Sequence, residues 1–183
     1  MTNFLVSLFR SSMDSTDVPL PIRLGLISPA FKSGDKVKPE NYRPISLTNH
    51  VSKVFERVIR PQMLSYLEEK GLFDDTNHGS RPGRSTLSQL LIQYNWTLQT
   101  LLQGDNVDLL YLDFQKAFDK VDFGILLMKL KNLGIAGKLG AWLGAFMMGR
   151  QQSVQVGDAT STWSEVVSGI PQGSVIGPYY SSS

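Results

Sequence analysis

The stretch LDFQKAFDKVD, residues 112–122, continues the run VDLLYLD, residues 107–113, and this junction decides the fold. The run is short, apolar and β-prone, so it predicts a strand over Val107 to Asp113 that ends on an acid. An amphipathic run with leucines at helical spacing follows from Gly124 to Leu133. A strand that leads into a helix indicates a mixed α/β chain.

Asp113 is the residue of this stretch with the clearest chemistry. An aspartate that ends an apolar strand is exposed at a sheet edge on rigid backbone. Mg²⁺ in phosphate-transfer sites is held by one or two such carboxylates together with substrate phosphates. The simpler interpretation is that Asp113 caps the helix that follows, and its spacing alone favours the cap.

Three further stretches carry candidate binding residues. SGIPQGSVIGP, residues 168–178, has glycines and prolines that let backbone approach a ligand, but taken alone the stretch favours an ordinary surface turn. GSRPGRST, residues 79–86, places two arginines on a turn before a helix, where they would bind phosphates or lie in an exposed loop with a serine cap. NYRPISL, residues 41–47, is the fourth stretch and has Lys32 upstream.

The rest of the chain predicts helices that alternate with short strands. Pro61 lies inside one helical run, so we expect a kink or two abutting helices there. The predicted helices cover 1–10, 52–70, 85–102, 124–133 and 139–148, and apolar residues at helical spacing predict a buried stripe on the helix over 85–102. The predicted strands are 24–27 and 107–113, with a hairpin over 153–167 that turns at Gly157-Asp158.

Composition excludes several classes of protein. Hydrophobic residues make up 42% and charged residues 19% of the chain, which is typical of a globular domain. The absence of cysteine removes disulfides, thiolate nucleophiles and cysteine-based zinc sites. Leu139 to Met148 is too short to span a bilayer, and Met1 to Phe9 lacks the basic start of a secretory signal. We therefore expect an intracellular protein without a membrane segment.

Basic charge is concentrated in one part of the chain. The net charge is only +2, but eight lysines and arginines stand against three acidic residues between Arg23 and Arg60. Such a stretch suits a polyanion, and a solvated basic face explains it equally well.

The four stretches, taken in this order, resemble the reverse transcriptase of non-LTR (LINE-type) retrotransposons, and most of all its jockey-like group. The resemblance runs from about Phe31 to Pro178. It implies a right-hand polymerase fold of the α+β type. Residues 1–104 would be fingers with an N-terminal extension, and residues 105–183 would begin the palm. The implied reaction is template-directed addition of deoxynucleoside triphosphates to a DNA primer on an RNA template, with two Mg²⁺ ions.

The resemblance also assigns roles to single residues. Asp113 matches the first catalytic aspartate, the backbone carbonyl of Phe114 a further metal ligand, and Phe118 the steric gate that rejects a ribose 2′-hydroxyl. The other matched positions would bind the triphosphate (Lys32, Arg43), the nascent base pair (Gln172, Gly173) and the template (Arg81, Arg84).

Three departures from the family pattern limit these expectations. Ser80 stands where an aromatic residue is usual, Phe123 stands where a histidine is usual, and the aromatic-Ala-Asp-Asp turn is missing. That turn supplies the remaining metal ligands and the strand that pairs with 107–113. We therefore expect a chain truncated before the Asp-Asp turn and inactive as a polymerase. Two alternatives are an RNA-binding remnant without catalysis and a pseudogene product.

Overall fold

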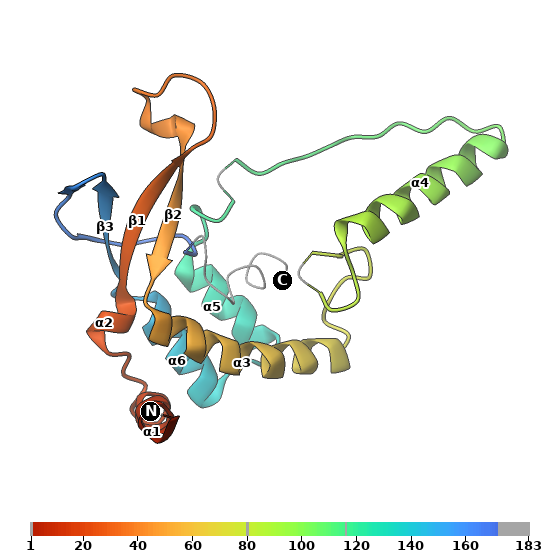
Figure 1. Ribbon diagram of the computed structural model, residues 1–183. Helices are drawn as coiled ribbons and strands as arrows, with labels where there is room; N and C mark the ends of the chain where they lie inside the picture. The colour runs from red at the N-terminus through yellow and green to blue at the C-terminus, as the bar shows by residue number, and fades with distance from the viewer. Residues whose placement is uncertain (1, 80, 116, 172–183) are drawn as a thin grey trace.

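The computed structural model describes residues 2–79, 81–115 and 117–171 and has the predicted mixed α/β composition (Figure 1). The five predicted helices are confirmed with ends shifted by a few residues, except that the first continues to Ser15. The helices are α1 Thr2–Ser15, α2 Leu20–Arg23, α3 His50–Glu69, α4 Thr86–Leu102, α5 Phe123–Asn132 and α6 Gly137–Met147, with the short 3-10 helix η1 Pro39–Asn41. The strands are β1 Leu24–Phe31, β2 Tyr42–Thr48, β3 Gln151–Val156, β4 Ala159–Thr160 and β5 Ser164–Glu165.

One five-stranded sheet is built around β1. The strand order is β2-β1-β3-β4, β1 runs antiparallel to β2 and parallel to β3, and β5 pairs with β3. The predicted turn at Gly157-Asp158 is confirmed between β3 and β4. The sheet therefore joins the hairpin near the N-terminus to the last strands that the structure describes.

The β1–β2 hairpin is longer than the sequence indicates. β1 was predicted only to Ile27, and β2 was not predicted. Pro29 and Pro44 face each other across the hairpin, and proline is accommodated where its missing N–H is not needed by a neighbouring strand. The buried residues of β2, Ser46 and Thr48, are polar. The sequence of β2 therefore lacks the alternation of apolar and polar residues that predicts a half-buried strand.

The core lies between α1, α3, α5 and α6. Phe9 of α1 stacks on Phe55 of α3 with ring centroids 4.1 Å apart, and Phe55 meets Trp142 of α6 edge-on at 4.4 Å. Trp142 has no exposed surface and donates a hydrogen bond from Nε1 to Ser12 Oγ at 2.9 Å. The first helix therefore packs as part of the core.

Helix α3 crosses Pro61 without a break. Of the two alternatives expected at Pro61, two abutting helices are wrong, and a kink stays a prediction. Proline removes the hydrogen bond to the carbonyl of Arg57, but Arg57 and Pro61 are both exposed, so water can reach the freed carbonyl. Asn49 caps the start of the helix through its side chain, which accepts from the Val51 N–H.

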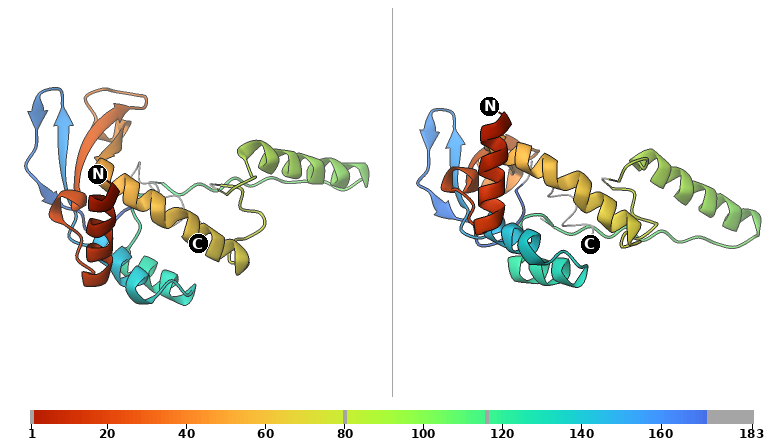
Figure 2. Two further views of the ribbon diagram at one scale, coloured as in Figure 1. Left: turned by 60° about the horizontal axis from the view of Figure 1, so that its bottom comes forward. Right: turned by 90° about the horizontal axis from the view of Figure 1, so that it is seen from below.

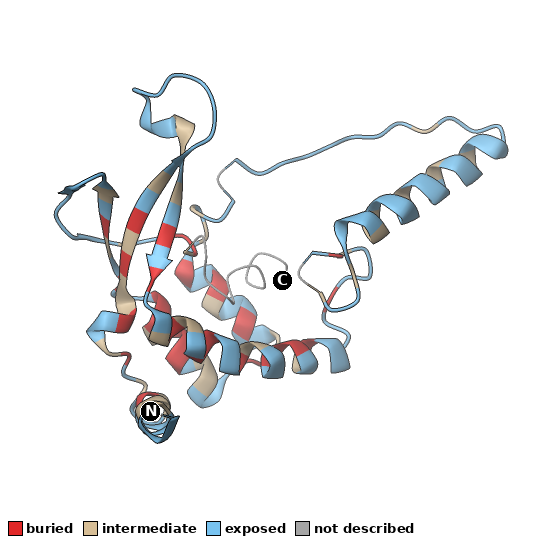
Figure 3. Cartoon of the chain, viewed as in Figure 1, coloured by how far each residue is buried: buried red, intermediate tan, exposed pale blue. Residues whose placement is uncertain are grey.

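Helix α4 projects away from the core, and residues 105–115 return beside it as extended chain (Figures 1 and 2). The predicted strand over Val107 to Asp113 is wrong, because no strand of the described residues pairs with this run and a strand exists only through such pairing. The predicted buried stripe of α4 is also wrong: no residue of α4 is buried, as the pale blue ribbon of Figure 3 shows.

None of the described helices is both long and apolar enough to cross a membrane.

Candidate functional site

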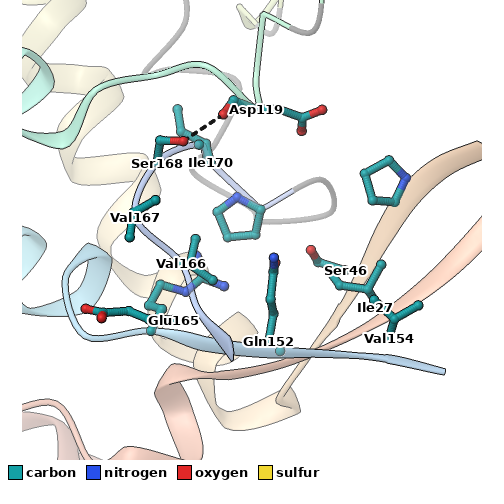
Figure 4. Close-up of a pocket in the computed structure, with 15 residues that line it drawn as sticks. Ile27, Ser46, Asp119, Gln152, Val154, Glu165, Val166, Val167, Ser168 and Ile170 are labelled. Carbon is teal, nitrogen blue, oxygen red and sulfur yellow. Dashed lines mark hydrogen bonds between the residues drawn. The ribbon is translucent and has the colours of Figure 1, made fainter. Parts of the chain in front are cut away.

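A cleft of about 330 Å³ lies between the sheet and the segment that follows β5 (Figure 4). The sheet contributes Ile27 of β1, Ser46 of β2 and Gln152 of β3, and residues 165–171 form the opposite wall. Asp119 closes one end, as Figure 4 shows. Hydroxyl, amide and carboxylate groups thus share this cleft with apolar side chains.

The segment 168–171 is fastened to residues 118–121. The Gly169 N–H donates to the Val121 carbonyl at 2.9 Å, and the Ile170 N–H donates to the Phe118 carbonyl at 2.8 Å. The Ser168 hydroxyl donates to the Asp119 carbonyl at 3.1 Å (Figure 4). The structure therefore brings two of the four motifs into direct contact at the cleft. We call this contact the 118–170 junction.

Gly169 is required by the junction. Its φ is +88°, and a Cβ atom there would lie 2.9 Å from the Asp119 carbonyl oxygen. Only glycine combines this backbone conformation with so close an approach. From the sequence we expected the glycines of SGIPQGSVIGP to let backbone approach a ligand. Gly169 instead lets backbone approach residues 119–121 of the same chain.

Lys32 and Arg43 lie together at the far end of the β1–β2 hairpin. Arg43 is paired with Ala30, and the Lys32 N–H donates to the Asn41 carbonyl at 2.8 Å. Both residues are exposed. Other residues of the same hairpin line the cleft, so the two predicted phosphate-binding cations and part of the cleft lining lie on one hairpin.

Asp113 and Phe114 are not among the residues that line the cleft. Both are exposed, Phe114 at 84%, on the extended chain after α4. In the described ranges no group of three histidine, cysteine or acidic residues could hold a metal ion. Asp113 alone does not complete a magnesium site there. It does not cap a helix either, because the cap of α5 is Asp122, whose Oδ1 accepts from the Ile125 N–H at 2.9 Å.

Arg81 and Arg84 are held by acidic residues of the chain. Arg81 forms a two-pronged contact with Glu68, at 2.9 Å from Nε and 2.7 Å from Nη2, and its side chain is 7% exposed. The hydrogen bond from Arg81 lowers the pKa of Glu68. Arg84 contacts Asp75 at 3.1 Å. A template phosphate would have to displace these partners to reach either guanidinium.

The remaining predicted positions are outside the described residues or have another role. Gln172, Gly173 and Ser80 lie outside the described ranges. Phe123, where the family pattern has a histidine, is a buried core residue at the start of α5. The serine cap expected before α4 is confirmed, since Ser85 Oγ accepts from the Ser88 N–H at 3.1 Å.

The sequence did not single out three residues that shape the cleft and its surroundings. Asp119 lies within LDFQKAFDKVD, so its place in this motif is the signal that could have identified it. Arg150, which lines the cleft, and Glu56 behind it are buried charged residues, 5% and 0% exposed. No sequence pattern marks them, because charged residues are ordinarily taken as surface positions.

The fold and the ordered motifs fit one class of protein. Residues 32–183 match the family described as reverse transcriptase (RNA-dependent DNA polymerase). The chain belongs to the reverse transcriptase family.

Its relatives include proteins of mobile elements. It is 37% identical to a probable RNA-directed DNA polymerase from transposon X-element of Drosophila melanogaster, over 87% of this chain and 18% of that protein. It is 33% and 30% identical to RNA-directed DNA polymerases from mobile element jockey of Drosophila funebris and Drosophila melanogaster, over 76% and 96% of this chain and 15% and 19% of those proteins. The resemblance to jockey-like retrotransposons is confirmed, and the chain spans less than a fifth of each relative.

Proposed function

We propose that this chain is the nucleotide-binding part of an RNA-directed DNA polymerase of a non-LTR retrotransposon. The observation that carries the proposal is the 118–170 junction. It joins the motif that contains Phe118 to the loop that runs on into Gln172. The cleft beside it is lined in part by the hairpin that carries Lys32 and Arg43. The proposed reaction, RNA-directed DNA synthesis, is the one that the description of the matched family names.

Each proposed role follows from the chemistry of the side chain. Lys32 and Arg43 bind the triphosphate, because exposed cations that lie close together can pair with several oxygens of a polyanion. Phe118, 37% exposed and held at its carbonyl by the junction, packs against the sugar and excludes a 2′-hydroxyl. Gln172 and Gly173 contact the nascent base pair.

The remaining assignments extend this proposal. Residues 1–104 correspond to the fingers, and residues 105–183 to the start of the palm. Arg81 and Arg84 bind template after exchanging their acidic partners for phosphate.

Metal binding is the incomplete part of the site. Asp113 and the Phe114 carbonyl would hold Mg²⁺, which supplies the charge that stabilises phosphoryl transfer. Two ions need further carboxylates on the opposite side, and the described residues gather no such set around Asp113. We therefore propose that this 183-residue chain alone does not extend a primer. Templated extension by the purified chain, with Mg²⁺ and four deoxynucleotides, would refute that.

The nucleotide site is tested by calorimetric titration of the chain with dTTP and Mg²⁺. Arg43→Ala is expected to weaken binding about tenfold, the usual effect of losing one charge-assisted contact to phosphate. The control is Arg10→Ala, an exposed arginine on α1 outside the cleft. Equal affinities of the two variants would overturn the assignment of Arg43. Phe118→Ala should allow UTP to bind nearly as well as dTTP.

A second candidate is RNA binding without catalysis, which the cluster of cations at the end of the hairpin favours. Lys32, Lys36, Lys38 and Arg43 are all exposed there. This candidate predicts RNA affinity that falls steeply with salt and does not change when dTTP is added. A ternary complex that forms only with a matched nucleotide would exclude it.

A further inference from the structure

Arg150 is the one arginine among the buried residues of the described ranges, and it lines the cleft. Its Nε is buried without a hydrogen-bond partner in the described part of the chain. A guanidinium in such surroundings costs free energy unless its neighbours compensate, and an apolar residue of the same size would pack there at lower cost. Its presence therefore points to something other than stability.

Its side chain is enclosed by three different elements. Burial lowers the pKa of Arg150 to about 10, and the carboxylate of Glu56 on α3 acts in the opposite direction. The guanidinium carbon lies 5.7 Å from the ring centroid of Phe146 on α6, within range of a cation–π contact. On β1, a Cβ atom at Gly25 would lie 3.8 Å from Nη2, an ordinary van der Waals distance, so the guanidinium lies directly against this strand.

Its backbone is attached to the loop of the cleft. The Arg150 carbonyl accepts from the Val166 N–H at 2.9 Å. The next residues, Gln151 and Gln152, begin β3 and pair with β5. After β5 the chain runs directly into the 118–170 junction. Contacts that hold Arg150 in place therefore also hold Val166, the first residue of the loop 166–171.

We propose that Arg150 is a positioning residue of the candidate nucleotide site: held by Glu56 and Phe146, it sets the position of the loop 166–171 and so of the 118–170 junction. The inference rests on the proposed function for what the loop binds. The positioning itself concerns only contacts within the chain.

The experiment compares amide hydrogen exchange, read residue by residue by NMR, with global stability from urea unfolding. Arg150→Met removes the charge and keeps most of the volume. Leu67→Ala, a buried truncation on α3 outside the cleft, is the control for general destabilisation. Arg150→Met is expected to speed exchange of the Val166, Gly169 and Ile170 amides about tenfold beyond what its loss of stability accounts for, and Leu67→Ala is not.

The double variant Glu56→Gln/Arg150→Met separates stability from positioning. Removing both buried charges together should restore much of the stability lost in Arg150→Met. Exchange at Gly169 and Ile170 should remain fast. Arg150→Lys, which keeps the charge but not the planar fork, should recover part of the protection. Exchange that simply follows global stability in every variant would overturn the inference.

A titration with dTTP separates this inference from the proposed function. Weaker nucleotide binding by Arg150→Met, with the exchange pattern above, supports both. A wild-type chain that binds no dTTP, while the exchange pattern holds, refutes the nucleotide site and leaves the positioning role standing.

Discussion

The hydrogen bond between Trp142 and Ser12 offers the sharpest test of how α1 joins the core. Ser12 Oγ accepts from Trp142 Nε1 at 2.9 Å and donates to the Asp17 carbonyl at 2.6 Å. Ser12→Ala removes both bonds and leaves a fully buried indole N–H unsatisfied, which costs about 1–3 kcal/mol. Trp142→Phe removes that N–H together with part of the buried ring, at a cost of about 2 kcal/mol.

The double variant gives the decisive number. Once phenylalanine replaces Trp142, Ser12→Ala leaves no indole donor unsatisfied, whereas the loss of the Asp17 contact is the same in both backgrounds. We therefore expect the double variant to be more stable than the sum of the singles predicts, by about 1–2 kcal/mol. Urea unfolding followed by far-ultraviolet circular dichroism measures all four proteins. Additivity within about 0.3 kcal/mol would refute the contact and with it this packing of α1.

Three further predictions concern the cleft, an ion pair and the exposed segment. Gly169→Ala should abolish dTTP binding, because a Cβ meets backbone across the junction, whereas Gly157→Ala, also at positive φ but with open space around it, should not. Arg81 lowers the pKa of Glu68 from its ordinary 4.5, so this pair stabilises the fold above that pH and loses its effect as pH falls through the lowered value. Glu68→Gln should flatten that acid limb in urea unfolding at a series of pH values. Leu110→Lys, at a side chain 84% exposed, should reduce self-association measured by light scattering.

Three of the predicted helices, α3, α4 and α5, carry signals of their own at one end, which made them predictable. Ser85 with Ser88 forms a capping box at the start of α4, Asp122 caps α5, and Gly71 follows α3. These signals depend on residues a few positions apart, which sequence reading captures. They say nothing about what a helix packs against, so the buried stripe expected on α4 was wrong although the helix itself was confirmed.

The strands were harder to predict because they depend on partners far along the chain. The run Val107 to Asp113 is mostly apolar and was predicted as a strand, but it has no pairing partner in the described residues. β2 has proline at position 44 and buried serine and threonine, yet it is a strand because β1 pairs with it over seven residues. β1 itself gains a parallel neighbour only from β3, at the opposite end of the described chain. In all three segments, strand formation depends on a pairing partner and not on the intrinsic preference of the residues.

The candidate site divides in the same way. Motif order marked Phe118 and the loop 168–173, but no local pattern says that the two touch. The contact depends on strand pairing. β3 pairs in parallel with β1, β5 pairs with β3, and the segment after β5 then hydrogen-bonds to residues 118–121. Arg150 lies where this return begins. A charged residue buried at such a crossing is recognised only after the fold is known, because the elements that enclose it come from three separate parts of the sequence.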